Sequence, residues 1–490
     1  TFYFFVTNCE RRRAKMLEWY AMAEAKKNPK RKEPTPLMTG IGYKSATDTW
    51  FDLHAWVQWF WAFGVPRPVL LGVLFVGLLG VLSMEVPHMP VFALGWILGT
   101  ASVWLPIVLV VAAWQTWVRY IRSLWISGRE TVLLEIKIPR EMTKSPRAME
   151  VALATLYQTS GETDFIKRAW VGRVRPWYAL ELASFGGDVH FYIWTWDFYR
   201  NTVETALYAQ FPEVEIHIVE DYAAKFRYDP DRWDGFVNDY KLAKSDAYPI
   251  KSYIDFELDK DPKEEFKIEP LAQMFEFLSA LKSHEQVWVQ IMLRATRTSG
   301  GALFPTNDLA KWKELQKKTV EDIRVEAIPE EMRDEKMRFP NPTWKQRAQM
   351  EAVERNSAKV PFDVSVRGIY LADTTKGGVN GPNIGILRFL WKPVGSDYLN
   401  ELGPDNDGGH NTLNYPWQDF RSIYKRAIMR RFIDAYRRRS CFYPPWTSTF
   451  NTMSVESIAT LWHFPSSTVA APGINRIPAT KAAPPPNLPL

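Results

Sequence analysis

Two uninterrupted apolar segments stand out from the alternation of hydrophobic and polar residues in the rest of the chain. The first covers residues 68–84 and the second residues 91–117, and neither contains a charged side chain. Only residues 85–90 separate them, so their lengths and spacing predict a transmembrane helical hairpin within residues 65–128. The apolar side chains of the first segment alone favour insertion by about −5 kcal/mol. The alternative is a pair of buried helices in a soluble core, but such helices usually keep one polar side.

Aromatic and basic residues flank this hairpin as membrane-interface residues do. Residues 50–63 are rich in aromatic side chains and predict an interfacial helix, within a basic and aromatic juxtamembrane segment 1–64. The connecting loop contains no Lys or Arg, whereas both outer flanks are basic. This predicts a multi-pass protein of the inner membrane whose termini and soluble region are cytoplasmic. The expected membrane-interface residues are Trp59, Trp61, Arg67, Trp117, Arg119 and Arg122.

Beyond the hairpin, strand periodicity alternates with helix periodicity. Strand spacing occurs at 131–139, 177–185, 189–196 and 214–222, and helix spacing at 145–159 and 197–211. A Gly-Gly-Asp sequence at 186–188 predicts a hairpin turn between the second and third strands. The order strand-helix-strand-strand-helix-strand predicts a ferredoxin-like unit over residues 129–225.

A similar order recurs in residues 226–465, which predicts a second, elaborated unit. Its expected elements are a strand at 248–258, a helix at 269–282, strands at 286–296 and 361–372, helices around 383–399 and 417–438, and a strand near 446–452. A charged excursion over 306–359 predicts a helical insertion, and the Pro-rich residues 466–490 a linker. The predicted fold class is therefore α+β with a transmembrane α-helical hairpin and tandem ferredoxin-like units, the second elaborated by a long helical insertion.

Composition narrows the classes of function. The 490 residues carry a formal net charge of +6, which is too small to indicate nucleic-acid binding by the whole surface. The two cysteines, Cys9 and Cys441, are far apart, which excludes a disulfide scaffold and a cysteine zinc site and agrees with a reducing compartment. Because the sequence starts at Thr1 with an apolar stretch, we expect it to begin inside a longer chain.

No motif of catalysis or cofactor binding is present in the sequence. It has no GxxxxGK[ST] phosphate loop, no paired metal-binding histidines, no GxSxG elbow and no Cys-His arrangement. The Gly-rich residues 374–385 are interpreted as a loop, and residues 403–410 as an exposed turn, because they lack the full spacing and terminal Glu of a calcium loop. We therefore expect no catalytic residue, cofactor or metal, and a chain that is not an enzyme on its own. A membrane-bound enzyme with an unrecognised site is an alternative.

Basic residues concentrate on one predicted helix, residues 417–439. Its expected apolar side consists of Phe420, Tyr424, Ile428 and Ala435. The residues expected to contact phosphate or a partner are Arg421, Lys425, Arg426, Arg430, Arg437, Arg438 and Arg439. Two interpretations remain open: a helix docked on the sheet with a solvated basic side, or a contact with DNA phosphates or an acidic protein partner.

The run N-T-x-S-x-E-x-I-A-T-L-W-H-F-P, from Asn451 to Pro465, resembles a segment in membrane proteins of candidate-phyla (Patescibacteria) bacteria. In those proteins the segment stands before, or in a protein encoded beside, a translocation ATPase of the type IV secretion or conjugation type. The resemblance covers most of residues 65–490, and the region it covers is a domain of unknown function. The ATPase motifs are absent from this sequence, so no nucleotide-binding residue is carried over.

The resemblance implies a membrane-anchored, non-catalytic component of a type IV secretion-like translocation system that docks a motor ATPase and DNA. The expected partners are the lipid bilayer, the translocation ATPase, DNA through helix 417–439, and a second copy of the chain in a homo-oligomer. A membrane scaffold or adaptor for envelope or pilus assembly, without a nucleic-acid role, is the alternative.

Overall fold

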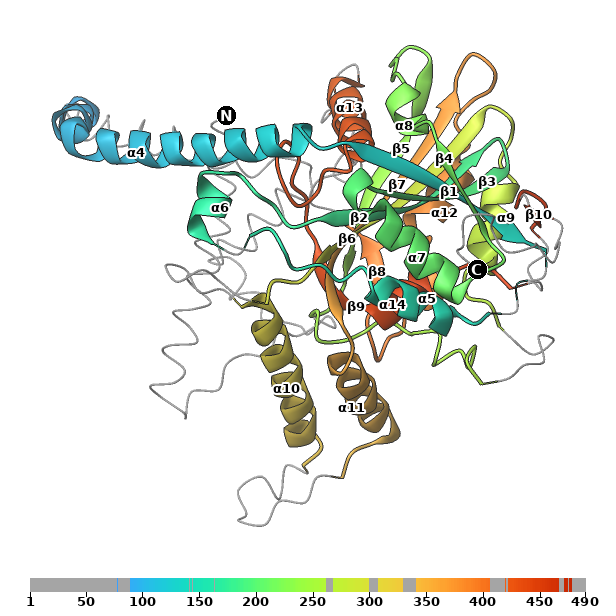
Figure 1. The fold of residues 1–490 in the computed structure, drawn as a ribbon. Helices are drawn as coiled ribbons and strands as arrows, with labels where there is room; N and C mark the ends of the chain where they lie inside the picture. The colour runs from blue at the N-terminus through green and yellow to red at the C-terminus, as the bar shows by residue number, and fades with distance from the viewer. Residues whose placement is uncertain are drawn as a thin grey trace. The chain divides into compact units, whose positions relative to one another are not determined.

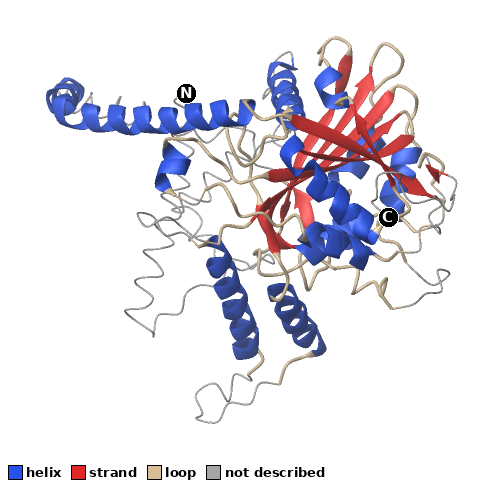
Figure 2. Ribbon diagram, viewed as in Figure 1, coloured by secondary structure: helices blue, strands red, loops and turns tan. Residues whose placement is uncertain are grey.

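The fold is α+β, with helices packed on both faces of a ten-stranded sheet (Figures 1 and 2). The computed structural model describes residues 89–140, 144–162, 164–260, 268–298, 307–328, 341–405, 422–466, 471–474 and 476–477, together with Gly77, Met142 and Asp419. The interfacial helix 50–63 and, apart from Gly77, the first predicted span 68–84 lie outside the described residues. The predicted site residues Trp59, Trp61, Arg67 and Arg421 also lie outside them.

The first half of the sheet has the predicted order of elements. It runs β1 (Thr131–Pro139), α5 (Pro146–Ala154), α6 (Phe165–Ala169), β2 (Trp177–Phe185), β3 (Asp188–Trp196), η1 (Asp197–Tyr199), α7 (Arg200–Gln210) and β4 (Glu215–Val219). The four strands pair antiparallel in the spatial order β4-β1-β3-β2. Gly186 and Gly187 form the predicted hairpin turn, with φ values of 63° and 102° that this two-residue turn requires.

The second half is longer and continues the same sheet. Its elements are α8 (Tyr222–Lys225), β5 (Trp233–Leu242), α9 (Ala272–Ser279), β6 (Glu285–Ala295), α10 (Asp308–Glu326), α11 (Trp344–Ser357), β7 (Pro361–Asp373), α12 (Gly381–Arg388), η4 (Lys392–Val394), β8 (Leu402–Pro404), α13 (Ile423–Arg437), β9 (Asn451–Ser454) and α14 (Val455–Leu461). Four of its strands pair antiparallel in the order β8-β5-β7-β6. β2 pairs with β6 from Trp177↔Arg294 to Phe185↔Gln286. The two predicted units therefore share one continuous sheet.

Residues 248–258 do not form the predicted strand. They fold into turns, in which the backbone amide of Ser252 donates to the Asp255 carboxylate at 2.9 Å, a local bond that competes with strand pairing. The first strand of this half is instead β5, which pairs with β7 on the side opposite β6. Its buried Asn238 and Asp239 hide the hydrophobic alternation. The strand beside β5 is the short β8. The strand predicted near 446–452 begins only at Asn451, as β9, and pairs with the start of β7.

The helical insertion is confirmed in its described part, where α10 and α11 lie side by side below the sheet in Figure 1. The start of the predicted linker 466–490 is not a free linker. β10 (Arg476–Ile477) pairs parallel with β1, and the Val189 amide donates to the Gly473 carbonyl at 2.8 Å. Residues 471–474 and 476–477 are therefore part of the folded domain.

Alternation along the strands divides the sheet into two faces, because successive side chains point in opposite directions. One face packs against α5, α7, α9 and α14 through apolar side chains such as Leu180, Phe191 and Ile291. The other face packs against α8, α13 and the end of α4 (Met89–Ser127) and includes Trp177, Trp194, Trp196 and Trp288. The first face holds the larger apolar core, and the second face carries the candidate site.

Helix α4 leaves the domain as a long arm (Figure 1). It has 39 residues, and within the described part of the chain it alone contains a segment long and apolar enough to cross a membrane, Gly99–Ser127. At 1.5 Å per residue the 29 residues of that segment extend about 43 Å, more than the roughly 30 Å of a hydrocarbon core. The second half of the predicted hairpin is thus a candidate membrane span.

Candidate functional site

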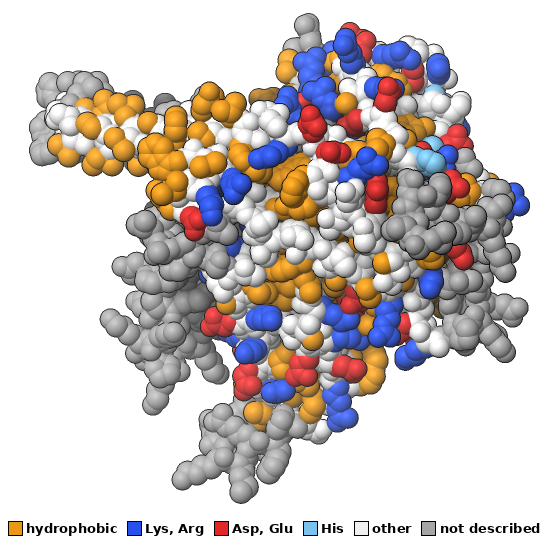
Figure 3. Space-filling view, viewed as in Figure 1, with side chains coloured by type: hydrophobic (Ala, Val, Ile, Leu, Met, Phe, Trp, Pro, Cys, Tyr) orange, Lys and Arg blue, Asp and Glu red, His pale blue; other side chains and the backbone are white. Residues whose placement is uncertain are grey.

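The end of α4 is fixed to the domain by aromatic contacts. Trp125 meets Trp196 of β3 edge-on, with ring centroids 5.2 Å apart, and Ile121 is buried. Further towards the N-terminus the side chains turn outward, and Val103, Ile107 and Val110 are each more than 60 % exposed. In Figure 3 hydrophobic side chains cover this arm, and basic side chains gather where it meets the domain. The predicted interface residues Trp117 and Arg119 lie on this last part of α4, and both are exposed.

Arg122, also predicted at the membrane interface, instead points towards a buried ionic cluster. Its guanidinium lies 3.6 Å from the Glu162 carboxylate, which also binds Arg175 and Arg297. Burial of Glu162 opposes its ionisation, but the surrounding guanidinium groups, Arg175 first, lower its pKa to about 2. Asp363 of β7 holds the other side of the cluster through Arg175 and Arg294. Electrostatic contacts therefore connect α4 to the middle of the sheet.

The basic helix α13 docks on the sheet through a face that differs from the predicted one. Met429, Phe432, Ile433 and Tyr436 are buried, at the i, i+3, i+4, i+7 spacing of a helix side. Tyr424, which was expected on the apolar side, is 63 % exposed, because the sheet lies under the later turns of the helix. Ala435 is buried as predicted, Ile428 is partly buried, and Phe420 lies outside the described residues.

Carboxylates neutralise much of the predicted basic surface. Lys425 lies 2.7 Å from Asp234 and Arg426 lies 3.4 Å from Asp231, while Arg437 and Arg438 both bind Asp434. Arg430 and its neighbour Arg431 are exposed, and within the described residues neither forms an ion pair with a carboxylate. These two arginines are therefore the cations of α13 best placed to meet an external phosphate or carboxylate.

Arg439 was predicted to contact a partner, but it is buried inside the domain. Its side chain is 1 % exposed and binds Glu181 of β2 at 2.9 Å and also Asp221. Burial alone would lower the pKa of Arg439, but the carboxylates of Glu181 and Asp221 raise it, so the guanidinium stays charged. Arg439 thus fastens the end of α13 to the sheet and is not part of an interaction surface.

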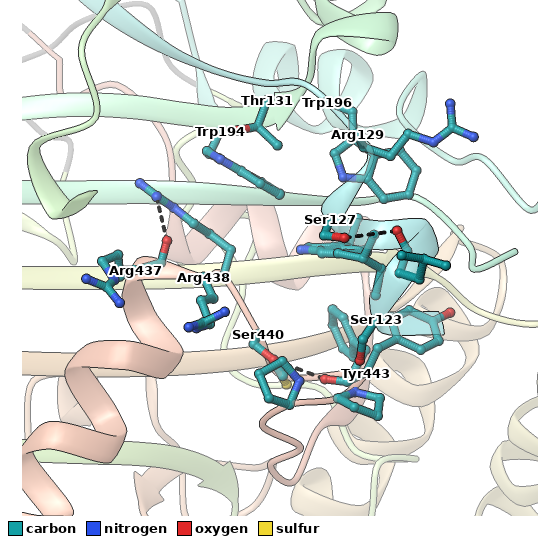
Figure 4. A pocket seen from close by; sticks show the side chains of 18 of the residues that line it. Ser123, Ser127, Arg129, Thr131, Trp194, Trp196, Arg437, Arg438, Ser440 and Tyr443 are labelled. Atoms are coloured by element: carbon teal, nitrogen blue, oxygen red, sulfur yellow. Dashed lines mark hydrogen bonds between the residues drawn. The ribbon is translucent and has the colours of Figure 1, made fainter. Parts of the chain in front are cut away.

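A pocket opens between the end of α4, the sheet and the loop that follows α13 (Figure 4). Its volume is about 570 Å³. Trp194 and Trp196 line one side, and Arg437, Arg438 and Ser440 come from the α13 end. Cys441 also lines it, but burial raises the pKa of its thiol, which disfavours the reactive thiolate. An aromatic wall with nearby guanidinium groups can hold an anionic or planar group.

The sequence prediction did not assign these pocket tryptophans a role, although one signal was present. Trp194 and Trp196 are two residues apart in a strand, so both point to the same face of the sheet. Trp177 approaches Trp196 at 5.0 Å from the neighbouring strand, but only the strand order brings them together. Among the described residues no three His, Cys, Asp or Glu side chains gather in a way that could hold a metal ion.

Comparison with known proteins adds no assignment to this geometry. No protein-family model matches the chain, and no curated protein is detectably similar to it.

Proposed function

We propose that this chain is a membrane-anchored, non-catalytic component of a type IV secretion-like translocation system, which docks a motor ATPase and contacts DNA. The observation that supports this most is the joint between α4 and the domain. An apolar helix of membrane-spanning length ends directly on a folded domain, and the basic helix α13 ends at the same corner, where both line one pocket. Such a domain stays close to the bilayer, where a translocation motor operates.

The distribution of charge supports a cytoplasmic domain. Residues 86–118 contain no charged side chain, whereas Arg119, Arg122 and Arg129 follow this uncharged run. The positive-inside rule puts that side of α4 in the cytoplasm. With the first predicted span at 68–84, the N-terminal side would also be cytoplasmic and the protein multi-pass.

The strand order supports the finer interpretation of the fold. In a ferredoxin-like unit the four strands follow the spatial order 4-1-3-2. β4-β1-β3-β2 has this order, and β8-β5-β7-β6 repeats it with the insertion of α10 and α11 before its third strand. We interpret the domain as two ferredoxin-like units joined edge to edge through β2 and β6.

The segment Asn451–Pro465, on which the resemblance to translocation-ATPase neighbours is most specific, belongs to the core. It forms β9 and α14, and every residue from Met453 to Pro465 is buried. Because these residues are buried, a sequence signature in this segment indicates a shared domain structure and not a docking surface. It supports a common fold with those membrane proteins, and the ATPase is then supplied by a partner or by a further part of the polypeptide.

A membrane scaffold or adaptor without a nucleic-acid role is the second candidate. The pairing of Lys425, Arg426, Arg437 and Arg438 with aspartates favours it, because these cations are already partly neutralised.

The test uses the full chain reconstituted in vesicles and a fluorescent DNA duplex. Several phosphate contacts would weaken binding steeply as salt rises, and this result supports the translocation role. A flat response, together with no ATPase recovered when the detergent-solubilised protein is purified from its host, would contradict that role and favour the scaffold. Alkaline carbonate extraction tests anchoring separately: release of the protein into the soluble fraction would exclude an integral membrane protein.

A further inference from the structure

A short helix outside the main core lies directly beside α4 (Figure 1). This helix, α6, stacks Phe165 on Trp114 with an interplanar angle of 8°. The Trp117 indole N–H donates to the Ala169 carbonyl at 3.1 Å, and the Trp170 ring meets both α4 tryptophans edge-on. The segment 164–172 therefore packs along the last exposed part of α4, and the chain returns to the sheet at Val174.

The backbone of this segment lies in direct contact with the backbone of α4. Gly172 has a φ of +74°, and a Cβ at this position would lie 2.5 Å from the Ile121 carbonyl oxygen. Only glycine fits both the conformation and the space. On the other side of α6, Glu162 binds Arg122 of α4. The segment is thus held to α4 at both of its ends.

The outer side of this segment exposes large apolar side chains next to the ion pair of Asp164 and Lys167, and nothing within the described residues covers these apolar side chains. Ile166 is 66 % exposed, Trp170 57 % and Val171 49 %. Arg168 is partly exposed and Arg173 exposed next to them. Large apolar side chains beside arginines are typical of a segment that lies in the membrane interface, where the rings and aliphatic chains enter the acyl boundary and the guanidinium groups meet phosphates.

The position of α6 along α4 matches that interface. The uncharged run of α4 ends at Val118, directly before Arg119, so the inner edge of a hydrocarbon core of roughly 30 Å, which about 20 helical residues cross, lies near this residue. Trp114 and Trp117 lie just before this point, at the level where tryptophans gather in membrane proteins. Because α6 contacts these two residues, Ile166, Trp170 and Val171 lie at the same depth.

We propose that α6 and the following Trp170–Val171 form a second membrane contact, which rests on the inner acyl–headgroup boundary and binds anionic phospholipids. This inference depends on the proposed anchoring by α4. The occupant is the bilayer because the apolar surface of α6 is continuous with the exposed apolar surface of α4. With two contacts, the domain has a fixed tilt over the membrane.

The test measures the depth of a nitroxide spin label in vesicles of phosphatidylcholine and phosphatidylglycerol. The full chain with Cys9→Ser carries the label at Ile166→Cys, and collision rates with oxygen and with a water-soluble nickel chelate are compared. Val110→Cys on α4 reports the span, and Ile386→Cys, on the exposed side of α12 over β5 and β7, serves as the aqueous control. We expect the ratio of oxygen to nickel accessibility at residue 166 to exceed that at residue 386 several-fold and to approach that at residue 110.

The possible outcomes distinguish failure of the α6 contact from failure of the membrane anchoring by α4. If residue 110 is in lipid while residue 166 behaves like residue 386, the second contact is wrong and the anchor stands. If residue 110 is in water, the anchor itself is wrong. Shielding of residue 166 from both reagents would mean that protein covers it and would also overturn the proposal. In the labelled protein, Gly172→Ala should move residue 166 towards the aqueous value without releasing the chain from the vesicles; no change would contradict the role of the close contact.

Discussion

The two faces of the sheet are built with different chemistry. On the face under α5, α7, α9 and α14 the strands contribute mainly aliphatic and aromatic side chains. On the face under α13, alternate positions of the same strands carry buried ionic and amide groups between the tryptophans. These groups are Glu181, Asp239, Gln290, Arg294, Asp363 and Arg367. One face is held by packing, and the other by packing together with directional contacts.

The two faces differ in how precisely they must hold the helices that pack on them. Apolar contacts are non-directional, so a helix can shift on them at modest cost. An ion pair at 2.8 Å, such as that between Arg367 and Asp239, has a defined geometry. Buried ion pairs add little net stability over apolar replacements, but losing one partner is costly. We interpret the polar face as the one that fixes α13 and the end of α4 in place.

The largest effect is expected from breaking the contact between α13 and the polar face. Arg439→Met leaves the Glu181 carboxylate buried without its main cation, which should destabilise the domain by about 3–5 kcal/mol. Urea unfolding of the detergent-solubilised chain, followed by tryptophan fluorescence, measures this change. The double variant Glu181→Gln with Arg439→Met should recover part of the loss, and Arg438→Met, whose side chain is half exposed, should unfold like the parent. Equal effects of Arg439→Met and Arg438→Met would contradict the structural role of Arg439.

On the apolar face a comparable loss should come from a cavity alone. Ile458 of α14 is fully buried, so Ile458→Ala should cost about 3–4 kcal/mol through lost contacts and the space left behind. Ile423→Ala at the exposed start of α13 is the matched control and should change stability by less than about 0.5 kcal/mol. Both are measured by the same urea unfolding. A double variant of Ile458 and Arg439 that deviates strongly from additivity would mean that the two faces are coupled through the sheet.

The polar face should also respond to acid. The pKa of Glu162 is lowered to about 2 in the folded domain, below its unfolded value of roughly 4.3. The ionised carboxylate therefore contributes up to about 3 kcal/mol above the unfolded pKa, and this contribution is lost as the pH falls from about 4 towards 2. Melting temperatures between pH 6 and pH 2.5 should fall less steeply in Glu162→Gln than in the parent, although the variant starts lower at pH 6. Parallel curves for the two proteins would rule out this role of Glu162.

The apolar face was the more predictable from sequence. Strands such as β1 and β7 were predicted to within one or two residues, because their alternation depends on local hydrophobicity alone. The turn at Gly186–Gly187 was predicted because glycine adopts the positive φ that the turn requires. β5 was missed because two of its buried residues are polar, and their partners come from distant parts of the chain: Asp239 binds Arg367. Buried ion pairs remove the hydrophobic signal at the strand positions where they occur.

The candidate site, too, could be predicted from the sequence only in part. The sequence identified α13 as basic and α4 as apolar, and both features are present. It did not separate exposed Arg430 from buried Arg439, since that depends on which side of α13 meets the sheet. The helical pattern predicts that Tyr424 is buried, whereas the buried aromatic residues of α13 are Phe432 and Tyr436. The pocket is built from segments far apart in the sequence, so the spacing of Trp194 and Trp196 was its one local signal.

The smallest change in stability, and the sharpest test of the outer side of α13, comes from its exposed arginines. Arg430→Ala combined with Arg431→Ala removes two cations that make no ion pair with a carboxylate within the described residues, so unfolding should shift by less than about 0.5 kcal/mol. If both contact DNA phosphates, the slope of log affinity against log salt should decrease in magnitude by about two, measured with a fluorescent duplex and vesicle-bound protein. Lys345→Ala combined with Arg347→Ala on the exposed side of α11 also removes two cations and should leave the slope unchanged. An equal effect of both changes would mean that only net charge matters, and α13 would then have no particular role in binding.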